Sequence, residues 1–317
     1  MWRLLPVSIS VILPTYNRAE ILRKALQGYA EQSCGQQVLE MLVVDDGSKD
    51  HTSAVVDECR RLFSTPLRYL WQENRGLAAA RNHGIREARA ELILFGDDDI
   101  IPSRHMVAEH IAWHSKHPEP NVGVLGYVTW APEVRPTPFM VWSGLYGPQF
   151  HFGKFKPGEE LDFWHAYFCN TSVKSRFLTD NGVFFSETFR QYGLEDTEMS
   201  FRLHQKGYRL LYNPDAFGYH YKYEKFDDTL RRIRESDASW QVFQRTEAGK
   251  YFTEMLRGQP IQTAKGITAV GKRLLRPFKE TMIPFFRPLL DTHIPLPGWL
   301  YERVLHHYVT LNRPPTT

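Results

Sequence analysis

The 317-residue sequence predicts an α/β fold in which helices flank a mostly parallel β-sheet, with a helical extension at the C-terminus. Three observations favour this fold. Short apolar runs alternate with helical patterns over the first hundred residues, polar turns rich in carboxylates follow three of these runs, and the pattern becomes helical again after Asp227. Short, continuously apolar runs are typical of parallel strands that are buried on both faces.

The alternation of strands and helices in the first hundred residues sets the expected topology. The predicted strands are four short apolar runs bounded by polar residues, at 7–13, 39–44, 67–71 and 92–95. Helical patterns lie between them at 19–32, after Asp50, and at 77–90. Right-handed crossovers between such strands place ligands at their carboxyl ends. We therefore expect a site where these strands end.

Residues beyond about 102 follow a less regular pattern. Further strands are predicted at 122–129, 166–173 and 209–213, and a helix at 195–207, where Gly207 gives a stop signal. Aromatic residues make up 14% of the chain and crowd residues 130–168. Flat rings in one region suggest a wall that stacks on sugars, and an ordinary aromatic core is the alternative.

Composition excludes several classes of protein. A net charge of only +3 argues against a nucleic-acid binder, which carries a concentrated basic face. The cysteines Cys34, Cys59 and Cys169 stand far apart, which argues against a disulfide framework or zinc site and favours a reducing cytosol. The apolar residues 1–14 are interrupted by Pro6 and lack a small-residue cleavage site, so a buried strand is expected rather than a signal peptide.

The acidic turn after the fourth predicted strand is the sharpest local feature. Asp97, Asp98 and Asp99 follow the apolar run directly. Like charges packed together destabilise a fold unless a positive charge joins them, and a hard divalent cation with oxygen ligands does so. The alternative is a solvated acidic turn.

Three other motifs carry candidate chemistry, each with a structural alternative. Asp45 or Asp46 at a strand end suits contact with a base or ribose, whereas a plain turn also uses Asp and Gly. Arg81, inside a helix that Gly76 opens, suits a phosphate or base, and a surface arginine is the alternative. Asp196, at a helix N-terminus, suits a general base, although helix capping explains an acidic residue there equally well.

The order of these motifs resembles family 2 of the glycosyltransferases, which have the Rossmann-like GT-A fold. The motifs are PTYNR at 14–18, VDDGSKD at 44–50, NRGLAAARN at 74–82, GDDD at 96–99 and LED at 194–196. The resemblance covers residues 7–222 and is specific for the superfamily rather than for a substrate. It implies contacts with a nucleotide-sugar donor at Pro14, Thr15, Asn17, Asp45, Asp46, Arg81 and Asp98.

The resemblance also implies a metal site and a catalytic base. Mn²⁺ or Mg²⁺ is expected at Asp97, Asp99 and His220, although a lone histidine beside aromatics is more often structural. Asp196, with Glu195 beside it, matches the base of an inverting transfer from a nucleotide-diphosphate sugar, with a UDP-sugar expected first. The acceptor is a glycan, a lipid-linked molecule or a small molecule. Residues 169–174 resemble a segment near the acceptor site.

The resemblance has one departure and leaves alternatives open. Residues 181–187 differ from the family's usual Gly-Gly-Phe-Asp-Glu sequence, so the acceptor contacts are not implied. A sugar nucleotidyltransferase and a non-catalytic nucleotide-sugar-binding module remain alternatives. The expected organisation is a catalytic domain at 1–226, divided into a donor half (1–101) and an acceptor half (102–226), and a helical extension at 227–317.

The C-terminal extension contains a basic amphipathic pattern at 261–287. A helix of this kind can lie on an anionic membrane surface, or it can pack on the catalytic domain with a solvated basic face. The first alternative places a cytoplasmic enzyme at the inner face of a membrane. No run of apolar residues in the sequence approaches the ~20 that a membrane span needs.

Overall fold

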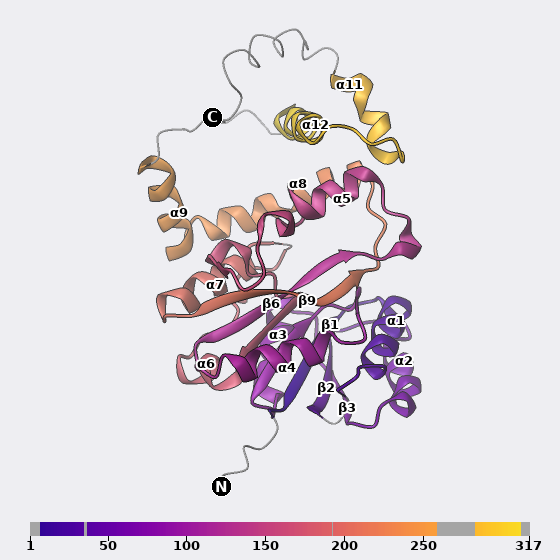
Figure 1. The fold of residues 1–317 in the computed structure, drawn as a ribbon, viewed down its shortest axis with the longest axis vertical. Helices are drawn as coiled ribbons and strands as arrows, with labels where there is room; N and C mark the ends of the chain where they lie inside the picture. The colour runs from indigo at the N-terminus through magenta and orange to yellow at the C-terminus, as the bar shows by residue number, and fades with distance from the viewer. Residues whose placement is uncertain (1–6, 35–36, 192, 259–282, 312–317) are drawn as a thin grey trace.

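The computed structural model describes residues 7–34, 37–191, 193–258 and 283–311. A mixed sheet runs through this part of the chain in the order β3-β2-β1-β4-β8-β6-β9-β5, and β7 pairs with β9 beside this path (Figure 1). The strands are β1 (Ile9–Thr15), β2 (Val38–Asp45), β3 (Leu67–Trp71), β4 (Leu92–Gly96), β5 (Ile100–Pro102), β6 (Val122–Trp130), β7 (Glu160–Leu161), β8 (Asn170–Lys174) and β9 (Arg209–His220).

Helices cover both faces of the sheet and continue beyond it at the C-terminus. They are α1 (Ala19–Ala30), α2 (Thr52–Cys59), α3 (Leu77–Glu87), α4 (Met106–Lys116), α5 (Pro138–Leu145), α6 (Ser175–Asp180), α7 (Glu195–Gln205), α8 (Phe226–Phe243), α9 (Glu247–Gly258), α11 (Ile283–Phe286) and α12 (Gly298–Leu311). The expected α/β fold with a helical C-terminal extension is confirmed.

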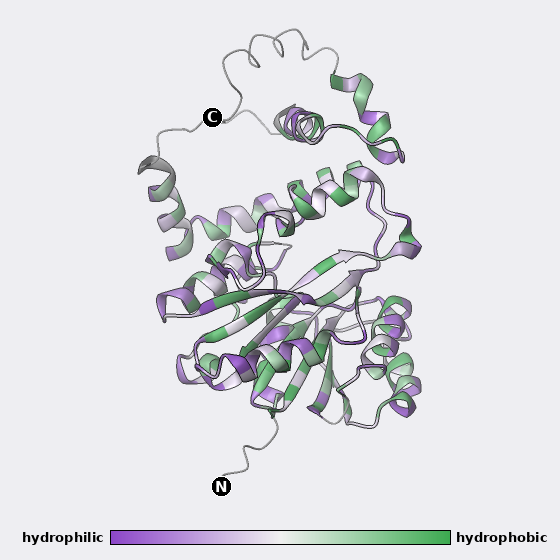
Figure 2. Ribbon diagram, in the orientation of Figure 1, coloured by the Kyte–Doolittle hydropathy of each residue, from purple (hydrophilic) through white to green (hydrophobic). Residues whose placement is uncertain are grey.

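The first four strands run parallel to one another, as predicted. Side chains alternate across a strand, so β1 contributes to two cores. Val11 and Leu13 pack with α1, α2 and α4 on one face, and Ile12 packs with α3 on the other. Figure 2 shows hydrophobic residues along the central strands and hydrophilic residues on the outer helix surfaces. Burial on both faces explains why these strands appear in the sequence as continuous apolar runs.

The second half of the sheet differs from the expected boundaries. The strand predicted at 166–173 is Asn170–Lys174, antiparallel to both neighbours. Its start is later because the Asn170 amide and the Thr171 hydroxyl both donate to the Tyr167 carbonyl, which makes a turn there. The strand predicted at 209–213 continues to His220, because an irregular register opposite Tyr127 accommodates the turn-like residues around Pro214.

The C-terminal helices form a layer of their own beside the sheet. α8 and α5 lie between the sheet and α12 (Figure 1), and Phe139, Phe226 and Tyr301 join these three helices in one apolar cluster. Most of the basic segment expected at 261–287 lies outside the described residues, since 259–282 are not among them. No helix in the described ranges has both the length and the apolarity that crossing a bilayer requires.

Candidate functional site

A cavity of about 740 Å³ opens where β1, β4 and β9 end and where α3 and α7 begin. The expected site therefore lies at the carboxyl ends of the parallel strands. Ten of the twelve candidate residues line this cavity: Pro14, Thr15, Asp46, Arg81, Asp97, Asp98, Asp99, Glu195, Asp196 and His220. Sequence segments more than two hundred residues apart, such as those of Pro14 and His220, thus meet in one place.

The first charged cluster in this cavity is centred on Arg81 and is called the Arg81 cluster below. One guanidinium nitrogen lies 3.0 Å from an Asp97 oxygen, and another donates to Asp196 over 2.7 Å and lies 3.8 Å from Glu195. The Arg81 side chain is 2% exposed and stands over the ring of Phe185. A buried arginine of this kind fixes the β4 turn relative to the start of α7.

The backbone conformation at the start of α3 positions Arg81. Gly76 precedes α3 with φ +92°, a conformation that L side chains rarely adopt. The carboxylate of Asp46 accepts hydrogen bonds from the amides of Arg75 and Gly76 and from the side chain of Gln72. Asp46 therefore holds the loop that starts α3, besides lining the cavity.

Burial shifts the pKa values in the Arg81 cluster. Desolvation, and then the neighbouring Asp196, raise the pKa of Glu195 to about 7. Burial likewise raises the pKa of Asp97, and Arg81 opposes that shift. The backbone amide of Phe168 donates to the second oxygen of Asp196 over 3.0 Å, so both oxygens of this carboxylate are oriented.

The second charged cluster is centred on Arg18 and is called the Arg18 cluster below. The guanidinium spans two carboxylates, at 2.8 Å from Asp98 and 2.7 Å from Asp99. The Thr15 hydroxyl donates to Asp98 over 2.7 Å, and His220 Nε2 lies 3.4 Å from Asp99. The Arg18 side chain is 42% exposed, in contrast to Arg81.

The two carboxylates of the Arg18 cluster have opposite shifts. Burial raises the pKa of Asp98 to about 7. Burial acts in the same direction on Asp99, but His220 and Arg18 outweigh it and hold the pKa of Asp99 well below its ordinary range. Asp99 is therefore an anion that lies among cationic or polar partners.

His220 is held between this cluster and an aromatic wall. Its ring stacks on Trp130, with centroids 5.0 Å apart and planes 13° apart, and its buried Nδ1 has no hydrogen-bond partner among the residues that the structure describes. The Trp130 indole donates to the carbonyl of Met140 over 2.7 Å. The imidazole is therefore fixed in orientation, with Nε2 toward Asp99.

Two candidate residues lie beside the cavity instead of on its wall. Asp45 accepts hydrogen bonds from the Ser48 amide and the Tyr69 hydroxyl. Asn17, with φ +52°, donates its amide to Ser48 and accepts the Lys49 amide on its side chain. Both residues shape the loops that follow β1 and β2.

Several polar cavity residues have no role assigned from the sequence, and they include Arg18, Gln149, Arg190, Lys222 and Arg232. Phe150 and Tyr167, which also line the cavity, belong to the aromatic region predicted at 130–168. Lys222 lies two residues after His220, and this spacing is the sequence feature that could have indicated that Lys222 lines the cavity. Within the described ranges, no group of three or more His, Cys, Asp or Glu side chains is arranged to hold a metal ion.

Comparison with known sequences identifies relatives. A family model described as "Glycosyl transferase family 2" matches residues 10–172, which are 163 of the 317 residues. The uncharacterized glycosyltransferase YfnE of Bacillus subtilis is 27% identical, over 71% of this chain and 67% of that protein. The validoxylamine A glucosyltransferase of Streptomyces hygroscopicus subsp. jinggangensis is 30% identical over 68% of this chain. The matched region covers 56% of that relative's length.

Solved structures share the fold. TarS residues 1–349 of S. aureus, solved with UDP, has a TM-score of 0.57 and 18% identity, over 96% of this chain and 90% of that one. The mannosyltransferase PcManGT of Pyrobaculum calidifontis, solved with GDP-Man and Mn²⁺, has a TM-score of 0.56 and 20% identity, over 98% and 76%. At these identities the likeness shows the fold alone, and it confirms the expected GT-A architecture.

Proposed function

The chain belongs to glycosyltransferase family 2, and from this premise we propose that it transfers a sugar from a nucleotide-diphosphate sugar to an acceptor hydroxyl. One observation carries the proposal. Arg81 joins Asp97, the candidate cation ligand, to Asp196, the candidate base, within a single cavity. The bound UDP and GDP-Man in the related structures support such a donor, with a UDP-sugar expected first.

The chain's own residues support an inverting displacement. Asp196 is near the N-terminus of α7, where the helix dipole favours its anionic form. It takes the proton of the acceptor hydroxyl as that oxygen bonds to the anomeric carbon. The bond from that carbon to the diphosphate oxygen breaks, and the nucleoside diphosphate leaves. Thr15, Pro14 and Asp46 line the donor side of the cavity.

The chemistry of the residues present fits a divalent cation, while the described side chains do not bring three ligands together in the arrangement where Arg18 bridges Asp98 and Asp99. Asp97 and Asp99 offer hard carboxylate oxygens and His220 offers an imidazole nitrogen, a donor set suited to Mn²⁺ or Mg²⁺. His220 is already oriented with Nε2 toward Asp99. A bound cation would neutralise the charge that develops on the leaving diphosphate. The cation in the PcManGT structure supports this choice.

We assign residues 1–101 to the donor half, 102–226 to the acceptor half and 227–317 to the extension. The donor half contains β1 to β4, and Asp97, Asp98 and Asp99 follow β4. The aromatic wall around Trp130 belongs to the acceptor half, beside His220.

The test compares two carboxylate variants with the wild-type protein. Asp99→Asn is expected to lose the Mn²⁺-dependent part of UDP-sugar affinity, since it removes an anionic ligand. Asp215→Asn changes an exposed carboxylate on β9 that does not line the cavity, and should retain that affinity. Titration calorimetry with and without Mn²⁺ measures both. Equal Mn²⁺-dependent affinity in Asp99→Asn contradicts the metal assignment, and pyrophosphate release from a nucleoside triphosphate supports a nucleotidyltransferase instead.

We also propose peripheral membrane contact through residues 261–287, at the cytoplasmic face. Only the basic amphipathic sequence supports this. In the full chain, replacement of Lys272, Arg273 and Arg276 by glutamate should reduce co-sedimentation with vesicles that contain anionic lipid. Equal co-sedimentation of the variant and the wild-type protein contradicts the proposal.

A further inference from the structure

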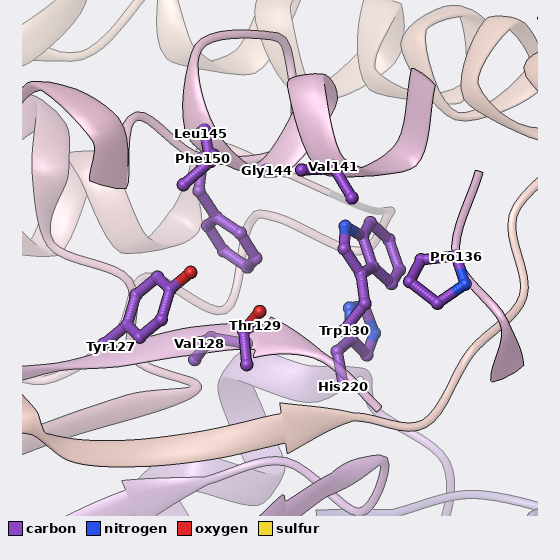
Figure 3. A pocket seen from close by; sticks show the side chains of 10 residues that line it. All are labelled: Tyr127, Val128, Thr129, Trp130, Pro136, Val141, Gly144, Leu145, Phe150 and His220. Atoms are coloured by element: carbon purple, nitrogen blue, oxygen red, sulfur yellow. The ribbon is translucent and has the colours of Figure 1, made fainter. Parts of the chain in front are cut away.

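A small side hollow opens from the acceptor side of the catalytic cavity. It has a volume of about 70 Å³ and lies between β6 and α5 (Figure 3). Phe150 and His220 line both this hollow and the catalytic cavity, so the two are neighbours through shared walls. Its remaining lining is Tyr127, Val128, Thr129, Trp130, Pro136, Val141, Gly144 and Leu145.

A larger groove of about 680 Å³ continues from that hollow toward the C-terminal helices. Pro136, Val141 and Leu145 line both spaces. The other walls come from α5 and from the start of α12, where Gly298 approaches Trp142 closely: a Cβ on Gly298 would lie 3.3 Å from the indole nitrogen. The hollow and the groove together are called the apolar track.

The chemistry of the apolar track differs from that of the catalytic cavity. No Asp, Glu, Lys or Arg lines either part of the track among the described residues, whereas the cavity contains the Arg18 and Arg81 clusters. One wall of the hollow is also fixed. Trp130 is held by its hydrogen bond to Met140 and its stack on His220. A track of this kind suits an uncharged, apolar ligand.

The groove exposes apolar side chains to solvent. Val141 is 41% exposed and Tyr146 is 51% exposed, and both line the groove. Ile294 and Trp299 are 53% and 41% exposed in the adjoining segment. Exposed apolar side chains that gather around a groove mark a binding surface.

We infer that the apolar track binds the hydrocarbon chain of the acceptor, an alkyl or prenyl chain attached to the group that carries the attacking hydroxyl. This inference rests on the proposed transferase function and names the acceptor class. The walls that the hollow shares with the catalytic cavity, Phe150 and His220, point to this occupant. The donor diphosphate binds in the charged part of the cavity. The chain of an acceptor whose hydroxyl lies near Asp196 can then extend into the neighbouring uncharged track.

The experiment measures how affinity depends on chain length. The probes are n-alkyl β-D-glucosides from methyl to decyl, used below their micelle concentrations and titrated into the full chain by calorimetry. Each buried methylene is expected to tighten binding by about fourfold until the track is full. In Val141→Glu this dependence should disappear, because a carboxylate then stands where both parts of the track meet.

Leu62→Glu is the matched control. Leu62 is 45% exposed, close to the 41% of Val141, and ends the short 3₁₀ turn Arg60–Leu62, away from the track. Its variant should keep the wild-type dependence on chain length. Equal affinity for methyl and decyl glucosides in the wild-type protein overturns the inference and means that another occupant covers the groove, such as a segment of this chain. Equal loss in both variants overturns it as well.

Donor binding separates this inference from the proposed function. UDP-sugar affinity with Mn²⁺ should be unchanged in Val141→Glu, since Val141 does not line the catalytic cavity. Chain-length-dependent binding without any donor turnover contradicts the transferase function and leaves the apolar site standing. Donor turnover without chain-length-dependent binding supports the transferase function and overturns the inference about the apolar track.

Discussion

The Arg81 and Arg18 clusters contain the same type of contact in two different environments. The Arg81 guanidinium pairs with three carboxylates and its side chain is 2% exposed, whereas the Arg18 guanidinium bridges two and its side chain is 42% exposed. A buried charge that loses its partner has no solvent to replace it, whereas an exposed one does. We infer that the Arg81 cluster is a fixed part of the frame and that the Arg18 cluster is exchangeable, so that a cation can replace the arginine.

The largest expected effect is on catalysis, at the carboxylate end of the Arg81 cluster. Asp196→Asn should reduce transfer about 10²- to 10⁴-fold, because an amide cannot accept the acceptor's proton. UDP-sugar affinity should be retained, since the donor carboxylates are untouched. Single-turnover kinetics and calorimetry measure the two quantities, and the melting temperature shows whether the variant is folded. Near-normal turnover in a folded Asp196→Asn excludes this residue as the base.

The next effect is on stability, at the centre of the same cluster. Arg81→Met should lower the free energy of unfolding by about 3–5 kcal/mol, because it leaves Asp97, Glu195 and Asp196 without their buried counter-ion. Urea unfolding followed by circular dichroism measures this loss. Exposed ion pairs typically contribute less than about 1 kcal/mol. If the free energy of unfolding of Arg81→Met falls by no more than this, the Arg81 and Arg18 clusters do not differ in how strongly they stabilise the fold.

The sequence predicts the Arg81 cluster better than the Arg18 cluster, for a physical reason. Asp97 follows a buried strand and Asp196 begins a helix, and both positions follow from hydrophobic period and topology. The bridge from Arg18 to Asp99 depends on side-chain rotamers across a loop, which no local pattern encodes. The stack of His220 on Trp130 and the apolar track likewise depend on segments far apart in the chain, where β6, α5 and α12 meet.

Boundary errors in the sequence-based prediction have the same origin. The strand predicted at 39–44 agrees with β2 to within one residue at each end, because residues 41–44 form a continuous apolar run that is buried on both faces. The strand at 209–213 was too short, because only the irregular pairing with β6 shows how Pro214 is accommodated. α4 and α5 were not predicted at all, since their apolar positions are mixed with His, Trp and Gly.

A smaller effect concerns pH and Glu195, the most buried acid of the Arg81 cluster. Its pKa is about 7 in the folded protein, compared with an ordinary value of 4.5. Between these values the folded state binds more protons than the unfolded state, so this group's contribution to stability is lost as pH rises from 4.5 to 7. Glu195→Gln should remove that loss and stabilise the protein at pH 8 by on the order of 1–3 kcal/mol.

Thermal unfolding between pH 4.5 and 8 measures the effect of Glu195→Gln. The matched control is Glu235→Gln, an exposed acid on α8, which should keep the wild-type dependence on pH. If Glu195→Gln also keeps the wild-type slope, the burial of Glu195 does not govern its protonation.

The last effect, and the sharpest test of exchange, is at Arg18. Arg18→Met should lower the free energy of unfolding by less than Arg81→Met, because the buried carboxylates of Asp98 and Asp99 keep the Thr15 hydroxyl and His220 as partners. The same change should increase the rise in melting temperature that Mn²⁺ produces. Arg18 and a cation both need the anionic oxygens of Asp99, so removing the arginine removes a competitor.

Arg23→Met separates this competition from a general loss of surface charge. Arg23 is 30% exposed and pairs with Glu58 and Glu20 on the helix surface, so its variant loses a comparable ion pair without touching the cavity. Its Mn²⁺-dependent shift should equal that of the wild-type protein. A smaller shift in Arg18→Met would mean that Arg18 supports cation binding instead of opposing it, and the Arg18 cluster would then be as fixed a part of the site as the Arg81 cluster.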